Sequence, residues 1–342
     1  MDLLKNVFLL CGAIALFLYA LKLLAEGVSD LAGGRLKKIV QSATANRCSA
    51  VLAGTLCTAV AQSSVATNMI VVALVEKGII NFLSASAVVM GTNIGTTVTA
   101  QLVSLSSVSE FDATALGSLV AFVGFLFTVT KINRLKAVGK SMLGFGFVFI
   151  GIELLTSAVE CFKGYAWFTG LFLVKNPFLL LLNGFVITAI LQSSSVVTSV
   201  MIVLAGLGLL DFEKALFITL GANIGTCLPV IFASTSMGKE SLQTAVFNLF
   251  FNVIGSVIFF PLLIIFKDFI CQAEIFSQST GRAIANFHTF FNLSVCLILL
   301  PFLKPLCKLI EKFYAFLIAD GITKKKGDGF LSFKAKRKRI AN

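Results

Sequence analysis

The sequence predicts an all-α polytopic membrane protein built from two inverted repeats. Each repeat is expected to hold a re-entrant hairpin and a broken transmembrane helix, and one extra span follows at the C-terminal end. Hydrophobic residues make up 57% and charged residues 13% of the 342 positions, whereas a soluble domain is nearer a quarter charged. Several apolar stretches reach the ~20 residues that a helix needs to cross a bilayer.

An internal duplication is the third observation behind this fold class. With a shift of 130 positions, "QSS" at 62–64 aligns with "QSS" at 192–194, and "GTNIGT" at 91–96 aligns with "GANIGT" at 221–226. The identities fall on Gln, Ser, Asn, Gly and Thr, rather than on the Leu, Val and Ile that any two apolar segments share. A repeat at fixed spacing indicates a duplicated structural unit. The predicted divisions are a first repeat at 1–131, a second repeat at 141–266, an extra transmembrane helix at 284–303 and a basic cytoplasmic tail at 304–342.

The elements of the first copy can be taken in order. Residues 7–28 are apolar and predict a first span, while 30–50 carry too many Lys and Arg residues to cross. Residues 51–75 are apolar but contain the polar "QSS" at their centre. Two further apolar stretches are expected to cross: 83–104, interrupted by Gly91, Asn93, Gly95 and Thr96, and 113–130.

The distribution of charged segments favours a hairpin over a full crossing for residues 51–75. With a hairpin, each copy makes an odd number of crossings, so the second copy is inverted. The basic segments 30–50 and 131–140 and the basic tail then share one side, and the acidic loop at 104–112 lies on the other. This is the asymmetry expected when the basic side is cytoplasmic. We therefore expect a multi-pass protein of the plasma or inner membrane with a cytoplasmic C-terminus, the first hairpin opening inward and the second outward.

The remaining composition limits the partners. Residues 321–342 hold eight Lys or Arg residues and one Asp, which predicts contact with anionic lipid; no nucleic acid is expected, because no aromatic stacking platform accompanies the charge. The eight cysteines are scattered singly and there is one histidine, so neither a metal site of the Cys/His type nor a cofactor is predicted. A homodimer is left open.

The polar interruptions predict a ligand site. Backbone freed at mid-membrane depth is tolerated only where it lines a protein-enclosed or watery cavity, and inverted repeats with broken helices are typical of secondary transporters. Helix N-termini and hydroxyl or amide donors favour an anion. Neither motif contains Lys or Arg, so a co-bound cation is expected to offset the anion's burial. A single "QSS" motif could instead serve helix–helix packing. Its repetition in the second copy favours a ligand site.

These paired motifs resemble the type II sodium/phosphate cotransporter family, over about residues 10–303. "FNLFFNVIG" (247–255) and "IANFHTFFN" (284–292) look like its flanking segments. The resemblance implies a symporter, not an enzyme, that takes up inorganic phosphate with Na⁺ by alternating access, without a PhoU-like C-terminal domain. The implied phosphate-binding residues are Gln62, Ser63, Ser64, Asn93, Thr96, Gln192, Ser193, Ser194, Ser195, Asn223 and Thr226. The implied sodium-binding residues are Gln62, Ser64, Thr92, Asn93, Thr97, Gln192, Ser195 and Asn223.

The chain departs from the family pattern at four places. Val65 replaces the third serine of the first motif, and Thr92 replaces an alanine. In the second copy, Cys227 and Pro229 stand where the first copy has threonines. These departures bear on the sodium sites and the coupling ratio more than on phosphate.

Other functions and residue roles remain as alternatives. Another small oxyanion or a carboxylate is a second substrate class, and a channel for anions is a second mechanism. An intramembrane serine hydrolase would use Ser64 or Ser194 with His288, but no GxSxG elbow is present. For His288 we favour a packing role. Lys22 and Glu153 occupy equivalent positions, and we favour a structural ion pair, either with each other or between Lys22 and Glu26.

Overall fold

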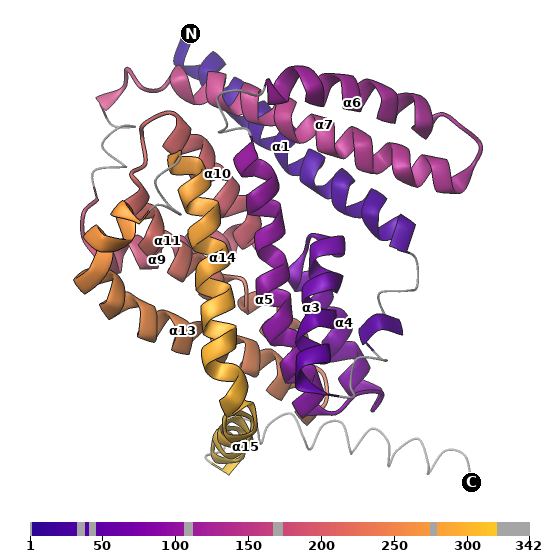
Figure 1. Cartoon of the computed structure of the whole chain (residues 1–342), viewed down its shortest axis with the longest axis vertical. Helices are drawn as coiled ribbons and strands as arrows, with labels where there is room; N and C mark the ends of the chain where they lie inside the picture. The colour runs from indigo at the N-terminus through magenta and orange to yellow at the C-terminus, as the bar shows by residue number, and fades with distance from the viewer. Residues whose placement is uncertain are drawn as a thin grey trace, which may run out of the picture.

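A computed structural model describes residues 2–32, 38–40, 46–105, 112–166, 174–273 and 279–319. Within these ranges the regular structure is helical throughout, with no β-strand (Figure 1). In chain order the helices are α1 (Asp2–Ala32), α3 (Arg47–Ala61), α4 (Ser64–Glu76), α5 (Phe82–Ser104), α6 (Ala113–Thr128), α7 (Asn133–Glu160), α9 (Pro177–Leu191), α10 (Ser194–Gly206), α11 (Phe212–Gly225), α12 (Leu228–Ser234), α13 (Lys239–Gln272), α14 (Thr280–Leu299), the 3₁₀ turn η4 (Leu300–Phe302) and α15 (Leu303–Ala319).

The helix bounds repeat along the chain with the spacing of the motifs. α3 and α9 both cover 15 residues, and α4 and α10 both cover 13 residues, each pair offset by 130 positions. The stretch of α5 corresponds to α11 and α12 together. The turns after α4 and α10 also have the same conformation at one position, since Gly78 and Gly208 both have positive φ values, 66° and 69°. The duplication predicted from the sequence is therefore present in the secondary structure.

Five helical stretches of the described residues are long and apolar enough to cross a membrane: Leu3–Leu31, Asn133–Glu160, Phe212–Ser234, Lys239–Gln272 and Thr280–Ala315. The protein is thus an all-α polytopic membrane protein. The pairs α3–α4 and α9–α10 are short apolar helices. A 15-residue helix is about 22 Å long, less than the ~30 Å hydrocarbon core, which is the length expected for the arms of a hairpin.

The predicted break in the first copy is wrong. α5 is a continuous helix from Phe82 to Ser104 through the whole "GTNIGT" motif. Its glycines serve packing instead of interruption: a Cβ atom on Gly91 would overlap the carbonyl oxygen of Val51 in α3. The same holds in the second copy, where a Cβ atom on Gly221 would meet the carbonyl oxygen of Leu181 in α9. Glycine costs a helix only about 1 kcal/mol relative to alanine, which this close packing offsets.

The break predicted in the second copy is present. α11 ends at Gly225 and α12 begins at Leu228, with Pro229 in its first turn. Proline has no N–H to donate to residue 225, and its ring clashes with that carbonyl group in a continuous helix. The first copy has Thr99 at the equivalent position, so its helix continues. The proline decides which of the two copies breaks.

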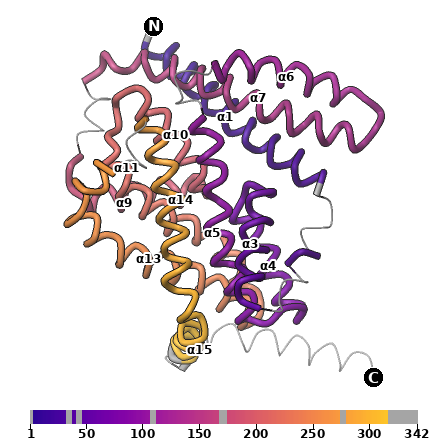
Figure 2. The backbone as a smooth tube through the Cα atoms, viewed as in Figure 1, coloured from indigo at the N-terminus to yellow at the C-terminus, as the bar shows by residue number. Residues whose placement is uncertain are grey.

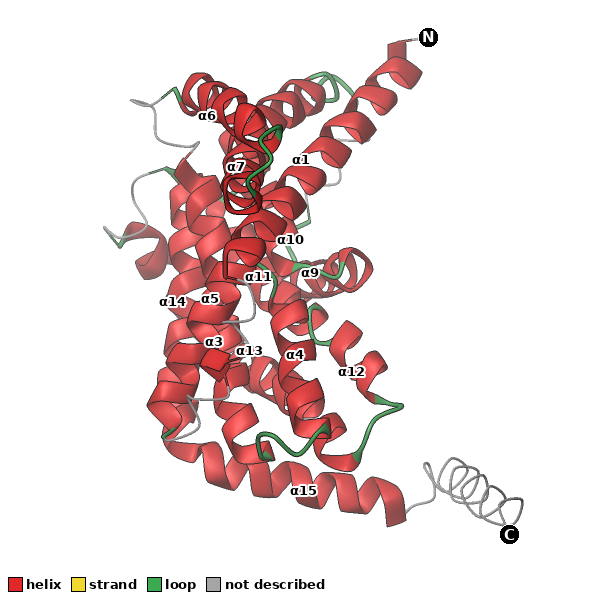
Figure 3. Cartoon of the chain, turned by 90° about the vertical axis from the view of Figure 1, so that its right-hand side faces the viewer, coloured by secondary structure: helices red, strands yellow, loops and turns green. Residues whose placement is uncertain are grey.

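Some helices differ in extent from the stretches expected in the sequence. Residues 133–140 belong to α7 and not to a loop. The C-terminal span α14 covers 280–299 rather than 284–303, and 303–319 of the predicted tail form α15. α15 lies across the end of α14 (Figure 3). Parts of the basic segment 30–50 and of the acidic loop 104–112, and the tail beyond residue 319, lie outside the described residues.

Two long helices form the centre of the molecule. α5 and α14 run side by side in opposite directions (Figures 1 and 2). The guanidinium of Arg282 donates to the Ser104 hydroxyl, and the Gln101 amide donates to the Thr289 hydroxyl at 2.9 Å. α10, α11 and α13 pack around this pair. At the periphery α7 lies against α1 and α6 (Figure 1).

One charged contact joins the first hairpin to the second repeat. Glu76, the last residue of α4, accepts hydrogen bonds at 2.7 Å from the N–H of Gly238 and from the hydroxyl of Ser241. Gly238 is the N-cap of α13. A carboxylate is stabilised at a helix N-terminus by the unpaired N–H groups and the helix dipole. These two hydrogen bonds hold the pKa of the Glu76 carboxyl below its usual value of 4.5.

We predict that this contact stabilises the protein only above acidic pH. Because the pKa is lowered by folding, the contribution is fully present above the unfolded carboxyl pKa and is lost as the pH falls through the folded value. Glu76→Gln should therefore lower the apparent unfolding temperature in detergent at pH 7, and the difference from wild type should shrink steadily below pH 4.5. Glu26→Gln, which removes an exposed pair with Lys22, is the control and should have little effect at either pH. A Glu76→Gln deficit of constant size across this pH range would contradict the account.

Candidate functional site

The two hairpin turns share an unusual backbone conformation. Gln62 and Gln192, which open the two "QSS" motifs, have φ values of 50° and 57°. In the described part of the chain they are the only non-glycine residues with positive φ. The left-handed region costs a residue with a Cβ roughly 1–2 kcal/mol. Strain kept at the same motif position in both copies is typical of functional sites.

The first serine of each motif begins the next helix. The hydroxyl oxygen of Ser63 accepts from the N–H of Ala66 at 3.2 Å, and that of Ser193 accepts from the N–H of Val196 at 3.4 Å. Each serine is thus the N-cap of a hairpin arm, α4 or α10. The hydroxyl hydrogen remains able to donate to a ligand. The first N–H groups of both helices, beside the cap, have no partner within the helix.

The two tips differ in exposure. In the second tip, Ser194 and Ser195 are buried and Gln192 is exposed, whereas Ser64 of the first tip is half-buried. The Ser195 hydroxyl lies 3.5 Å from the carbonyl oxygen of Thr96 in α5. This contact brings the second "QSS" motif against the first "NIGT" motif. The structure thus joins two of the sequence-predicted residues that are 99 positions apart.

A chain of side-chain contacts links α5 to α13 and to the break between α11 and α12. Asn93 donates to the side-chain oxygen of Asn248 at 3.1 Å, and its own oxygen accepts from Asn252 at 3.1 Å. The amide nitrogen of Asn252 also lies 3.4 Å from the sulfur of Cys227. All four residues are buried. The side-chain amide of Asn252 therefore contacts both Asn93 of the first copy and Cys227 of the second.

The second "NIGT" motif faces α14. The side-chain oxygen of Asn223 lies 3.4 Å from Nε2 of His288, and the Thr226 hydroxyl donates within α11 to the carbonyl oxygens of Ala222 and Asn223 at 3.0 Å. Four buried polar atoms in this region of α11, α13 and α14 have no hydrogen-bond partner among the described residues: Asn223 Nδ2, Asn252 Oδ1, His288 Nδ1 and Asn292 Oδ1. Such atoms normally bind an ordered water or a ligand.

The remaining predicted sodium residues, Thr92 and Thr97, both form hydrogen bonds to carbonyl oxygens of α5, and Thr92 also contacts α4. Thr97 donates to the carbonyl oxygen of Ile94 at 2.8 Å. The hydroxyl of Thr92 lies 2.9 Å from Asn68 Oδ1 and 2.8 Å from the carbonyl oxygen of Val89. Thr92 therefore connects α5 to α4, an arm of the first hairpin.

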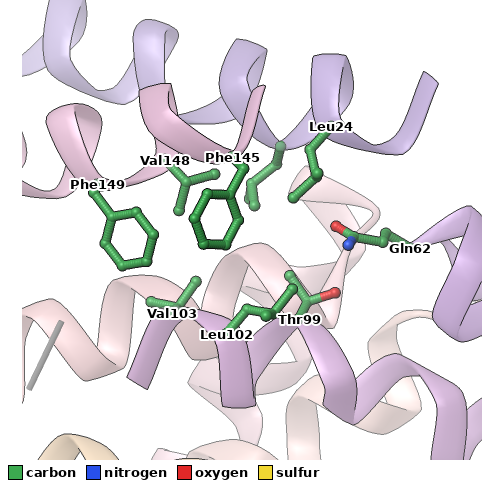
Figure 4. A pocket seen from close by; sticks show the side chains of 9 residues that line it. Leu24, Gln62, Thr99, Leu102, Val103, Phe145, Val148 and Phe149 are labelled. Carbon is green, nitrogen blue, oxygen red and sulfur yellow. The ribbon is translucent and has the colours of Figure 1, made fainter. Parts of the chain in front are cut away.

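Gln62 lies on another side of α5 from the Asn93 cluster. Its side chain lines a small cavity of about 10 Å³ with Thr99, between α1, α5 and α7 (Figure 4). The side-chain oxygens of Gln62 and Thr99 are both buried without a partner. Leu24, Phe145 and Phe149 form the apolar part of the wall. The structure thus leaves Gln62 apart from the Asn93 cluster.

The buried polar side chains of the described residues are uncharged. They are Thr, Ser, Asn, Gln and one His, and no Lys, Arg, Asp or Glu is among them. Burying an unpaired ion costs far more than burying a hydrogen-bonded amide or hydroxyl. A charged ligand among these helices would therefore have to be stabilised by dipoles and hydrogen bonds, without a fixed counter-charge.

Several residues of this centre were not predicted from the motifs. Asn68, Asn248, Asn252 and Asn292 were not predicted as site residues, although the last three lie in the quoted stretches "FNLFFNVIG" and "IANFHTFFN". Asn248 and Asn252, like His288 and Asn292, are four residues apart. Polar residues at i and i+4 in an otherwise apolar helix share one face, and this spacing was the available signal.

We predict that Asn252→Ala destabilises the protein. The change removes the donor to Asn93 Oδ1, and a buried polar atom left unpaired costs about 1–3 kcal/mol. The measurement is the apparent unfolding temperature in detergent. Ser256→Ala is the control one helical turn further on, because the Ser256 hydroxyl lies 3.3 Å from the carbonyl oxygen of Leu220, which can retain its helical partner. If both variants lower the apparent unfolding temperature equally, the amide chain stabilises the protein no more than an ordinary side-chain hydrogen bond.

Comparison with known proteins places these features in a family. The model of the family described as "Na+/Pi-cotransporter" matches residues 16–157 and 171–290. YqeW of Bacillus subtilis, an uncharacterized protein, is 29% identical over 310 residues, which are 87% of this chain and 95% of YqeW. The "Putative inorganic phosphate export protein YjbB" of Escherichia coli is 27% identical over 302 residues.

The coverage of these relatives differs. The match covers 87% of this chain but 54% of YjbB, so the chain spans about half the length of that relative. "Sodium-dependent phosphate transport protein 2B" of Bos taurus is 40% identical over 102 residues, which are 29% of this chain and 14% of that protein. No solved structure matches. The family match covers both copies of the motifs, and the chain belongs to the Na⁺/Pi-cotransporter family, which is a family of transporters and not of enzymes.

Proposed function

We propose that this protein is a sodium-coupled symporter of inorganic phosphate that works by alternating access. The observation that carries the proposal is the repeated strained turn. Two glutamines hold the left-handed conformation at equivalent positions, and each turn is followed by a serine-capped helix N-terminus. Helix N-termini with hydroxyl groups beside them are suited to phosphate.

The uncharged surroundings support coupling to a cation. An oxyanion bound among neutral dipoles keeps most of its charge, and a cation bound beside it would lower the free energy of both. Side-chain oxygens such as Asn252 Oδ1 and Asn292 Oδ1, both buried and unpartnered, are hard ligands of the kind that Na⁺ accepts. Each ion would then raise the affinity for the other by the same factor.

The proposed ligands remain those assigned by the motifs, with one refinement. Ser194, Ser195, Thr96, Asn93 and Asn223 lie on the helices that pack together at the centre, and they are the phosphate and sodium ligands that we favour. For Gln62 to join them, the first tip would have to leave the cavity beside Thr99. The unequal exposure of the two tips is what one state of an alternating-access cycle would present.

The names of the relatives bear on the direction of transport. The Bos taurus protein is named for sodium-dependent phosphate transport, and YjbB is named for export. A symporter runs in the direction that its combined gradients favour, so an inward Na⁺ gradient should drive uptake. The site therefore supports uptake under that gradient.

We predict that purified protein in proteoliposomes accumulates ³²P-phosphate when Na⁺ is high outside, and not with K⁺ or H⁺ gradients of equal size. Ser194→Ala and Asn223→Ala should each reduce the initial rate by about tenfold or more, because each removes a charge-assisted hydrogen bond worth about 1.5–3 kcal/mol. Ser118→Ala, an exposed serine of α6 that donates within its helix, is the matched control. Uptake independent of Na⁺ would reject the coupling. Stronger competition by sulfate or a carboxylate than by unlabelled phosphate would instead favour the second substrate class.

A separate prediction concerns the left-handed glutamines. Gln192→Gly keeps the backbone conformation, since glycine adopts positive φ without strain, but removes the carboxamide. We expect stability within about 1 kcal/mol of wild type together with a large loss of ³²P-phosphate uptake. Gly206→Ala, in an open position at the end of α10, is the control. Full uptake by Gln192→Gly would show that the side chain serves the turn alone.

A further inference from the structure

A basic cavity that contains no residue of the motifs lies between the end of α1 and the start of α7. Its volume is about 640 Å³, and it is lined by Asp30, Leu31, Asn133, Arg134, Lys136, Ala137 and Lys140. Lys140 Nζ lies 2.8 Å from Asp30 Oδ2, so this pair is neutral. In the described part of the chain Arg134 and Lys136 have no ion-pair partner, and both side chains are exposed. The cavity therefore has two uncompensated positive charges.

The helix itself adds to this positive field. α7 begins at Asn133, its N-cap Ile132 makes no side-chain hydrogen bond, and its first turn contains no acidic residue. The N-terminus of a helix is equivalent to about half a positive charge, so cations there are unfavourable and anions favourable. Arg134 and Lys136 thus stand where the dipole disfavours them. A bound anion would relieve both the charge repulsion and the unpaired N–H groups.

The neighbouring surface is apolar. Ile132 and Val129, in the turn before α7, are 63% and 68% exposed. Phe125 and Leu126 in the last turns of α6 are also exposed. In a protein with membrane-spanning helices, such side chains contact lipid chains. An exposed apolar surface next to a cluster of cations is the composition expected at the level of the lipid headgroups.

We propose that this cavity binds the phosphate group of an anionic phospholipid headgroup. Arg134 and Lys136 would contact the phosphate oxygens, the open N–H groups at the start of α7 would donate to them, and the acyl chains would lie along the exposed side chains of α6. Basic cavities beside membrane helices on the cytoplasmic side recognise headgroups in this way. A lipid suits this place better than free phosphate because the apolar surface beside it must be covered in any case.

The test compares lipid retention by the full chain and its variants in native mass spectrometry. Purified protein in detergent is mixed with phosphatidylglycerol or with phosphatidylcholine at equal concentration. Arg134→Gln/Lys136→Gln should weaken phosphatidylglycerol binding by roughly thirtyfold, because each Lys or Arg near a membrane surface contributes about 1 kcal/mol. Phosphatidylcholine binding should not change. The basic tail is present in every variant, so lipid that it binds cancels in the comparison.

Two further variants keep the result interpretable. Lys163→Gln/Lys175→Gln removes two positive charges outside the cavity and should retain lipid like wild type. Arg134→Lys/Lys136→Arg preserves the charges and should retain most of the binding, which also shows that the site tolerates substitution. The proposal is overturned if the cavity pair and the control pair lose lipid equally, if wild type binds both lipids alike, or if inorganic phosphate displaces phosphatidylglycerol at equal concentration.

Discussion

The structure depends on one constraint: polar groups in the middle of an apolar helical protein must be satisfied without any fixed charge. The described buried polar side chains are hydroxyls, amides and one imidazole, and most bond to a backbone carbonyl group in their own helix or to one another. The amide chain from Asn93 through Asn252 to Cys227 is the clearest case. This satisfaction is incomplete at Asn223, Asn252, His288 and Asn292, and we propose that the ions bind there.

The duplication supplies this arrangement twice, and the second copy is not identical. Both copies keep the left-handed glutamine, the serine cap and the glycine contacts between parallel neighbours. The helix after the hairpin is continuous in the first copy and broken near Pro229 in the second. In the proposed transport cycle, two hairpin tips that open to different sides would not have to be in the same state at once.

Much of the fold could be predicted from residue pattern, and the errors have physical reasons. The "QSS" turns and the repeat period were readable because Gln and Ser are rare in apolar runs. The continuity of α5 was not, because the glycines of "GTNIGT" signal a break or a close helix contact equally well, and only the position of α3 decides. The Asn93–Asn252 contact joins residues 159 positions apart, and a local sequence pattern cannot predict a contact between residues so far apart in the chain. The placement of Gln62 beside Thr99 depends on how α1 and α7 pack, which is also a non-local property.

The most direct measurement of the central claim is equilibrium binding to the detergent-purified protein, with ³²P-phosphate and ²²Na⁺ as separate labels. If uncharged groups hold both ions, phosphate affinity should rise at least about tenfold when Na⁺ replaces choline, and Na⁺ affinity should rise by the same factor when phosphate is added, since coupling free energies are reciprocal. Phosphate binding of equal strength in Na⁺ and choline would contradict the account, because neutral dipoles alone would then suffice for the anion.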